Sequence, residues 1–216
     1  MKDFLIRILY NFIKVLWLFP LDKNKAVFRS SQGEKYNCNP KYISEYLVKS
    51  ESGFRIVWIF NHPERYSFLK KDGIVLCKSN RLRACYHLAT AKYILDNHGL
   101  PSYLPHRKGQ CVINTWHGGG AYKKTSQKRT EYAEQYHRYM EQNTDYYISS
   151  CERFSRCNLA DVPPEKILPF GTARNDLFFA DTTAVREKVR KKYGISDGCR
   201  LIMYAPTFRG FHRDTD

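Results

Sequence analysis

Short runs of apolar residues alternate along this chain with longer segments in which apolar side chains recur every three or four positions. The short runs are typical of strands covered by helices on both faces. They fall at residues 26–30, 54–60, 74–77, 93–95, 111–115, 145–150 and 167–170. The periodic segments, typical of helices, begin at Asn39-Pro40 and recur at residues 80–90, 126–142, 152–159 and 182–193. Strands that alternate with helices predict an α/β fold with a Rossmann-like parallel sheet.

The same periodicity predicts which side of two helices faces the sheet. Asn39 is interpreted as a helix cap that is followed by a first-turn proline. The predicted inward face of that helix carries Tyr42, Ile43, Tyr46 and Leu47. In the segment 80–90, the predicted inward residues are Leu82, Cys85, Tyr86 and Ala89.

A last apolar run, at residues 201–204, follows the basic helix 182–193 and predicts one more strand. A lone strand cannot bury both of its faces. We therefore expect an N-terminal helix over residues 1–22 and a Rossmann-like domain over residues 23–181. Residues 182–216 are expected to hold a crossover helix and the first strand of an incomplete second domain.

The N-terminal segment 3–19 is predicted to be a helix with its polar side chains on one narrow stripe, namely Asp3, Arg7, Asn11 and Lys14. Four polar positions argue against a helix that spans a membrane, and the absence of a small-residue cleavage site argues against a secretory signal. We predict a helix that lies in the membrane interface, with Trp17 at the headgroup level and Arg7 and Lys14 near anionic lipid. The alternative is that the helix packs on the protein's own core.

The net charge narrows the choice of partners. The chain has 36 Lys and Arg residues and 21 Asp and Glu residues, which gives a formal charge of +15. Such an excess favours a nucleic acid, a membrane surface or a polyphosphate-like substrate. The basic residues are dispersed and show no nucleic-acid-reading signature, so we predict no nucleic-acid partner.

Seven cysteines are scattered along the sequence, and none forms a C-x-x-C pair. This spacing argues against a zinc site, and we predict no metal. Several of the cysteines lie in apolar runs, where a free thiol behaves as a small hydrophobic group. The pattern favours a reducing, cytoplasmic setting.

Three consecutive glycines follow the strand predicted over residues 111–115, and Lys123 and Lys124 come shortly after them. Glycine tolerates positive φ, so the amides of Gly118 and Gly119 can form an anion-binding concavity. The two lysines add positive charge beside it. We predict a phosphate site at this turn; the alternative for the lysines is a solvated basic edge.

His117 lies between that strand and the glycines. An open α/β sheet presents its ligand site at the carboxyl ends of its strands, and an imidazole can act as a general base near neutral pH. His117 is therefore the candidate catalytic residue; the alternative is a partly buried histidine in a glycine hairpin. The remaining histidines with no partner pattern are interpreted as structural or solvated, namely His62, His87, His98, His106 and His137.

Three motifs, in this order, resemble those of the CDP-glycerol glycerophosphotransferases that build teichoic acids. They are Thr115-Trp-His-Gly118, Gly171-x-x-Arg-Asn-Asp176 and Tyr204-Ala-Pro-Thr-Phe-Arg209. Asn39-Pro-Lys-Tyr42, Trp58 and Asp145-x-x-Ile-Ser149 also resemble positions of that family. Each motif alone is weak, but three of them in the correct order form a specific signature.

The resemblance implies the N-terminal half of a GT-B-type two-domain fold with a truncated second domain. It implies transfer of glycerol phosphate from CDP-glycerol, with release of CMP, to a hydroxyl of a lipid-linked acceptor. That acceptor is a polyprenyl-diphosphate glycan or a polyol-phosphate chain, and no cofactor is needed beyond the activated donor. The implied location is the cytoplasmic face of the cell membrane, where the protein is peripheral and contacts an anionic surface.

The resemblance also implies roles for individual residues. His117 matches the catalytic histidine, which takes the proton of the acceptor hydroxyl. Arg174, Asn175 and Asp176 match a turn that lines the same site; the alternative is that Arg174 and Asp176 pair and cap the following helix. The positions that match a turn near the donor phosphates are Thr207 and Arg209.

Three departures from the family pattern bear on activity. Residues 119–122 read Gly-Gly-Ala-Tyr where the family has Thr-Pro-Leu-Lys, and Ala173 replaces the usual proline. The family's C-terminal domain, with its second histidine and nucleotide pocket, has no counterpart in these 216 residues. The isolated chain is therefore expected to lack turnover. The alternative function is a non-catalytic remnant that binds a membrane or an anionic polymer.

Overall fold

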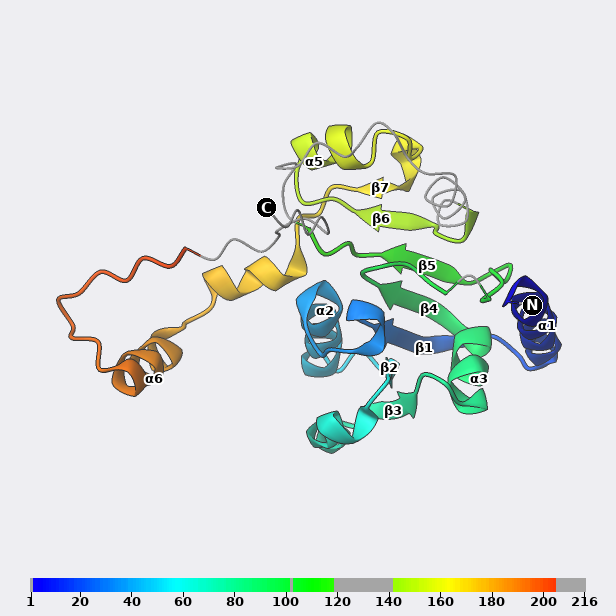
Figure 1. Ribbon diagram of the computed structural model, residues 1–216, viewed down its shortest axis with the longest axis horizontal. Helices are drawn as coiled ribbons and strands as arrows, with labels where there is room; N and C mark the ends of the chain where they lie inside the picture. The colour runs from blue at the N-terminus through cyan, green and yellow to red at the C-terminus, as the bar shows by residue number, and fades with distance from the viewer. Residues whose placement is uncertain (1, 102, 119–141, 205–216) are drawn as a thin grey trace, which may run out of the picture. The chain divides into compact units, whose positions relative to one another are not determined.

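A seven-stranded parallel sheet forms the framework of the protein (Figure 1). The computed structural model describes residues 2–101, 103–118 and 142–204. The strands are β1 (Asp22–Arg29), β2 (Arg55–Phe60), β3 (Val75–Lys78), β4 (Ala91–Asp96), β5 (Cys111–Asn114), β6 (Tyr146–Ile148) and β7 (Ile167–Leu168). Their order is β3-β2-β1-β4-β5-β6-β7, and every neighbouring pair is parallel. The predicted α/β fold with a Rossmann-like parallel sheet is confirmed.

Helices and short 3-10 turns connect the strands. The α-helices are α1 (Lys2–Val15), α2 (Cys38–Lys49), α3 (Leu82–Thr90), α5 (Glu152–Asn158) and α6 (Thr183–Tyr193). The 3-10 segments are η1 (Leu16–Leu18), η2 (Ser31–Gly33), η3 (Pro63–Asp72), η4 (Pro164–Lys166) and η5 (Ala173–Phe179). The helix predicted over residues 126–142 lies outside the described residues, apart from its last position.

The alternation of side chains along β1 separates the two layers of the core. Val27 faces a cluster that includes Ile13 of α1 and Leu88 of α3. Ala26 and Phe28 face the opposite cluster, which contains the buried Trp58 and receives apolar side chains of α2 and η3. Successive residues of a strand point to opposite faces, so both faces of the central strands are covered. This burial explains why the strands read as continuous apolar runs.

Two helices pack on the sheet with only part of the face that their sequences predict. On α2, Tyr46 is 70% exposed, and the partly buried Ile43, Leu47 and Val48 make the apolar contacts. On α3, Leu82 at the first position is 67% exposed, and core packing begins at Ala84. Tyr86 of α3 is also exposed, whereas Cys85 and Ala89 are buried as predicted.

Asn39 is not the cap of α2. The helix begins at Cys38, so Asn39 lies in its first turn and is fully buried. The side chain of Asn39 points away from its own helix, to the carbonyl oxygen of Thr115 at the end of β5. A residue that looks like a local cap is therefore a tertiary contact.

The N-terminal helix presents apolar side chains to both the core and the solvent. Ile13 is fully buried, and the half-buried Leu9, Leu16 and Trp17 pack against the same cluster. The opposite side carries exposed apolar side chains, namely Ile8, Phe12, Val15, Leu18 and Phe19. None of the described helices is both long and apolar enough to cross a bilayer.

Backbone carbonyl groups anchor the end of this helical segment to the domain. The Arg107 guanidinium donates to the carbonyl oxygens of Trp17 (2.9 Å), Phe19 (3.0 Å) and Ala89 (3.1 Å). Lys14 is exposed, with its Nζ atom 4.5 Å from the centre of the Tyr10 ring. The helix therefore packs on the protein's own core along one face, as the alternative prediction stated. Arg7 belongs to α1, but its side chain lies outside the described part.

The chain divides into two compact units, Met1–Asp176 and Leu177–Asp216. The first unit contains the sheet and the second contains α6. The strand predicted over residues 201–204 is wrong: these residues are extended without strand pairing, and their side chains are 64–88% exposed. A strand needs a hydrogen-bonded neighbour, and no described segment pairs with this one.

Candidate functional site

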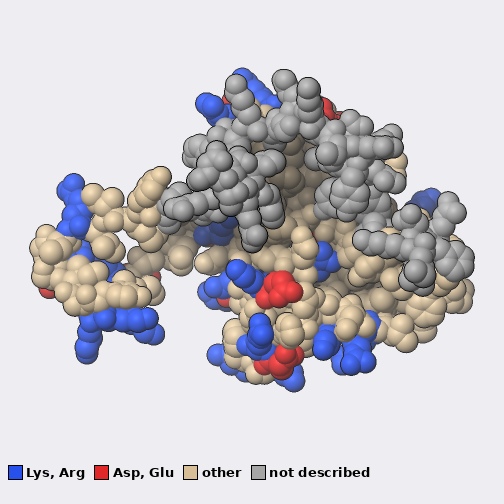
Figure 2. Space-filling model, viewed as in Figure 1, with Lys and Arg blue, Asp and Glu red and all other residues tan. Residues whose placement is uncertain are grey.

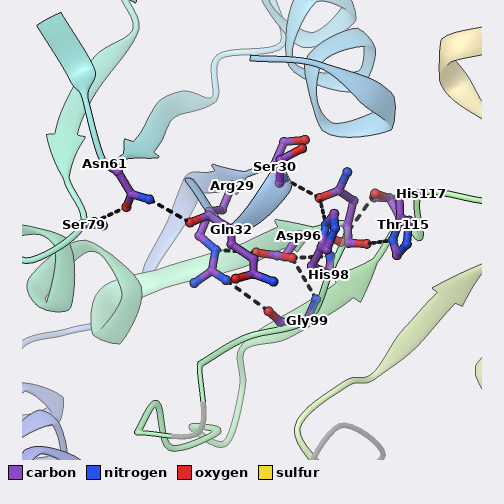
Figure 3. A network of polar contacts seen from close by, with 12 residues as sticks. Arg29, Ser30, Gln32, Asn61, Ser79, Asp96, His98, Gly99, Thr115 and His117 are labelled. Atoms are coloured by element: carbon purple, nitrogen blue, oxygen red, sulfur yellow. Dashed lines mark hydrogen bonds and ion pairs between the residues drawn. The ribbon is translucent and has the colours of Figure 1, made fainter. Parts of the chain in front are cut away.

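The strand order reverses between β1 and β4, which is the position where open α/β sheets bind ligands. Polar side chains and loops link the carboxyl ends of neighbouring strands there (Figure 3). Ser79 after β3 donates to Asn61 after β2, which in turn donates to the carbonyl oxygen of Gln32 after β1. The backbone N–H of Ser31 donates to Asn97 after β4. The network ends at His117, after β5.

His117 is exposed at this edge, with one ring nitrogen engaged. Its Nδ1 atom lies 2.8 Å from the backbone carbonyl oxygen of Asn97 (Figure 3). A carbonyl oxygen can only accept, so Nδ1 carries the proton in this contact. The neutral ring therefore has an unprotonated Nε2, which is the form that a general base requires.

A strained turn, residues 114–118, presents this ring; it is called the His117 turn below. Trp116 has φ 53°, a left-handed value that is uncommon for a bulky residue. Its N–H donates to Asn114 Oδ1 (2.9 Å), and the N–H of Thr115 donates to the carbonyl oxygen of Asp96 (2.8 Å). A Cβ atom on Gly118 would lie 3.1 Å from the Trp116 indole nitrogen. A side chain at position 118 would therefore require the Trp116 ring to shift by a few tenths of an ångström. Backbone strain of the kind seen at Trp116 clusters at functional sites.

Two aromatic rings stack on His117. The His98 ring lies parallel to it, with centroids 4.2 Å apart and an interplanar angle of 8°. The Trp116 ring is also close to parallel, at 5.2 Å. Burial, then the neighbouring His117 and Arg29, lower the pKa of His98 to about 4. His98 is therefore neutral at physiological pH and places no positive charge against the His117 ring.

A buried ion pair supports the loop that holds both histidines. Arg29 Nε lies 2.7 Å from Asp96 Oδ2, and the Asp96 side chain is 1% exposed. Asp96 Oδ1 accepts from the backbone N–H groups of His98 (2.5 Å) and Gly99 (2.8 Å). Burial raises the pKa of Asp96, whereas Arg29 and these hydrogen bonds act in the opposite direction. The carboxylate thus fixes the loop whose carbonyl group holds His117.

Arg174 lies in the turn after β7, and its side chain contacts the His117 turn. Its Nη1 group donates to the carbonyl oxygen of His117 (2.8 Å) and contacts Cys38 Sγ (3.3 Å). Among the described residues, its Nε and Nη2 groups have no partner, and no ion pair joins Arg174 to Asp176. The alternative prediction, in which these two residues pair with each other, is therefore not what the structure shows. Asn175 and Asp176 are exposed.

Three of the predicted site residues, His117, Gly118 and Arg174, lie close together, but the residues that hold them were not among those predicted. Asn97 and His98 lie in a polar Asp-Asn-His-Gly segment at the end of β4. Polar residues at a strand end could have indicated that this loop belongs to the site. His98 stacks on His117, so its interpretation as one more structural or solvated histidine overlooked this contact. The predicted site residues that lie outside the described part are Gly119, Lys123, Lys124, Thr207 and Arg209.

Fold and site together define a class of protein. A doubly wound parallel sheet binds ligands at the carboxyl ends of its strands beside the switch point, and His117 lies at that edge, one strand further along, after β5. A model of the CDP-Glycerol:Poly(glycerophosphate) glycerophosphotransferase family matches residues 11–215. The chain belongs to this family, and the predicted resemblance is confirmed.

Relatives of known name are polymerases and primases of teichoic acid synthesis. The chain is 28% identical to the teichoic acid poly(glycerol phosphate) polymerase of Bacillus spizizenii, over 96% of the chain and 56% of that protein. It is 27% identical to the teichoic acid ribitol-phosphate primase of the same organism, over 100% of the chain and 59% of that protein. The chain therefore spans a little over half the length of these relatives.

A solved structure shows the same fold. The wall teichoic acid polymerase TagF, which is GT-B-like, matches with a TM-score of 0.72 and 24% identity, over 96% of this chain and 54% of that one. A histidine-to-asparagine variant of TagF has been solved after a soak with CDPG. The parallel sheet described above is thus shared with about half of a teichoic acid polymerase.

Proposed function

We propose that this protein transfers glycerol phosphate from CDP-glycerol to a hydroxyl group of a lipid-linked acceptor in teichoic acid synthesis. Membership of the family supports the reaction class. Both glycerol-phosphate and ribitol-phosphate enzymes occur among the relatives. The family description and the poly(glycerol phosphate) polymerase favour glycerol phosphate as the transferred group. The proposed acceptor is a polyprenyl-diphosphate glycan or a polyol-phosphate chain.

The observation that carries this proposal is the exposed His117 ring with its Nδ1 bound to a carbonyl group. In the proposed step, the acceptor oxygen attacks the phosphorus of the glycerol phosphate group, and the bond from that phosphorus to the CMP oxygen breaks. His117 Nε2 takes the proton of the acceptor hydroxyl. The charge that leaves with CMP is neutralised by positive groups, and the free Nε and Nη2 of Arg174 are the described candidates.

The proposal is tested by following CMP release from CDP-glycerol in the full-length protein with a lipid-linked acceptor. We expect His117→Ala to reduce the rate at least a hundredfold, since general-base catalysis contributes about 10² to 10⁴. His62→Ala is the matched control, because His62 is exposed and the polar contact of its side chain in the described part is with Glu64. Equal rates for the two variants would refute the role of His117. If the unmodified protein binds the polymer or vesicles yet releases no CMP, the non-catalytic alternative replaces the proposal.

We also propose that the protein acts at the cytoplasmic face of the membrane through the exposed side of α1 and η1. Two observations support contact with a membrane surface. Phe12, Val15 and Leu18 are 42%, 58% and 86% exposed, and a helix that is apolar on its core-facing and solvent-facing sides suits an interface with lipid. The formal charge of +15 favours an anionic surface. Figure 2 shows Lys and Arg side chains in several separate groups on the viewed face.

A further inference from the structure

Asn39 joins the His117 turn to the turn that carries Arg174. Its side chain is buried, with 0% exposure. The Nδ2 group donates to the carbonyl oxygens of Thr115 (2.8 Å) and Trp116 (3.2 Å). The Oδ1 atom accepts from the backbone N–H of Arg174 (3.2 Å). One amide therefore binds three backbone groups, from two segments that lie far from it in the sequence.

The chemistry of these contacts requires a primary amide. Two carbonyl acceptors call for an NH₂ donor, and a backbone N–H calls for an oxygen acceptor. Aspartate keeps the acceptor and loses the donor, whereas alanine loses both. Glutamine has both groups, but its extra methylene has to fit into a fully buried site. Asparagine is therefore the residue that satisfies this junction.

Two residues next to the Asn39 side-chain amide, Cys38 and Trp116, have unfavourable backbone conformations. Cys38 has φ 58° and Trp116 has φ 53°. Such left-handed residues cost on the order of 1 kcal/mol each and persist only where surrounding contacts determine them. The Nδ2 group of Asn39 donates to the carbonyl oxygen of Trp116 itself, and Cys38 directly precedes Asn39 in the chain. Loss of the amide allows the His117 turn to relax toward an ordinary conformation.

We infer that Asn39 is a positioning residue that sets the placement of the His117 ring relative to the Arg174 guanidinium. The His117 ring belongs to the turn whose carbonyl oxygens accept hydrogen bonds from Asn39 Nδ2. The guanidinium belongs to Arg174, whose backbone N–H donates to Asn39 Oδ1. The Arg174 guanidinium also donates directly to the carbonyl oxygen of His117. The consequence for catalysis rests on the proposed function, whereas the geometric link does not.

The test compares Asn39→Asp with Asn37→Asp. The first keeps the acceptor for Arg174 and removes the donor to the His117 turn. The second is the matched control, because Asn37 Oδ1 only accepts hydrogen bonds, from the hydroxyl groups of Ser30 and Ser31, and aspartate can still accept them. Two readouts are taken on the full-length protein. Proton–nitrogen correlation NMR reports the tautomer of His117, and steady-state kinetics of CMP release report kcat and KM.

We expect Asn39→Asp to lose the Nδ1–H tautomer signal of His117 and to lower kcat at least tenfold, with a change in KM for CDP-glycerol of less than about twofold. Asn37→Asp is expected to keep both the signal and the rate. An unchanged tautomer and kcat in folded Asn39→Asp would overturn the inference. A changed tautomer in a protein that releases no CMP in any form would support the geometric link and refute the proposed function.

A measurement on the unmodified protein covers the case in which Asn39→Asp does not fold. The Asn39 NH₂ group and the Arg174 N–H are expected to exchange with solvent at least a hundredfold more slowly than exposed amides, because all of them are engaged at a buried junction. Exchange of the Asn39 side-chain protons at the rate of an exposed amide would overturn the inference.

Discussion

The Nδ1 atom of His117 lies 2.8 Å from the backbone carbonyl oxygen of Asn97, a residue on the neighbouring strand end. This contact determines which ring nitrogen is free, and it makes the geometry of the catalytic candidate depend on the loop after β4. Asp96 and Arg29 form a buried ion pair that supports that loop. Changes at residues that never contact a substrate are therefore expected to alter the site.

The first prediction concerns the Arg29–Asp96 pair. Asp96→Asn keeps an oxygen acceptor for the loop amides but leaves the Arg29 guanidinium, which is 12% exposed, without its counter-charge. Loss of one partner of a buried pair costs about 3 kcal/mol or more. We expect a loss of this size in the free energy of unfolding, measured with urea. The double variant Arg29→Met with Asp96→Asn should recover part of the loss; simple additivity of the two single changes would contradict a direct coupling.

The second prediction concerns Arg174. Arg174→Met removes the donor to the His117 carbonyl oxygen and the two described groups available for phosphate. We expect kcat/KM for CDP-glycerol to fall at least tenfold, because charge stabilisation and positioning are both lost. The free energy of unfolding should change by no more than about 1 kcal/mol, since Arg174 is only half-buried. Arg156→Met is the control, because Arg156 is exposed and pairs with Glu152 on its own helix.

The third prediction concerns His87, which is 8% exposed and has no hydrogen-bond partner for either ring nitrogen among the described residues. Burial, then the nearby charges of Lys25, Arg83 and Arg55, lower its pKa from 6.5 to about 4. The unfolded chain therefore binds more protons between these two values, and stability falls as the pH drops from 6.5 to 4. The expected loss is on the order of 2–3 kcal/mol.

His87→Leu removes this proton linkage. We expect the variant to lose less free energy of unfolding than the unmodified protein between pH 7 and pH 4 in parallel urea titrations. Some dependence remains, because the pKa of His98 is lowered in the same way. An identical pH dependence in the two proteins would show that His87 is not a source of it.

The fourth prediction concerns α1 and η1. Val15→Ser with Leu18→Ser removes two exposed apolar side chains without touching the core. We expect binding to phosphatidylglycerol vesicles, measured by sedimentation, to weaken about thirtyfold, since each side chain contributes on the order of 1 kcal/mol when buried in lipid. Phe68→Ser with Leu82→Ser is the matched control, because these side chains are 55% and 67% exposed elsewhere on the same unit. Equal weakening in both pairs would argue against α1 as the lipid-binding surface.

Local patterns were enough to predict the framework of the fold. Each of the seven strands overlaps a predicted apolar run, because burial on both faces favours a run that is visible without any partner. His117 was recognisable for a similar reason, as it follows such a run directly and precedes glycines. Residues 201–204 show the limit of this reasoning. Their apolar run predicts a strand, yet pairing depends on a neighbour that the run itself does not specify.

The sequence by itself determined the alternation of strands and helices, the family motifs and the histidine at a strand end, since all of these reside in neighbouring residues. Only the tertiary structure decided what surrounds that histidine. Asn39 and Arg174 reach the His117 turn across 76 and 57 residues, and Asn97 does so across 20. Hydrogen bonds at such separations depend on the order and register of the strands. That order follows from packing of the whole sheet and leaves no signal in the local pattern.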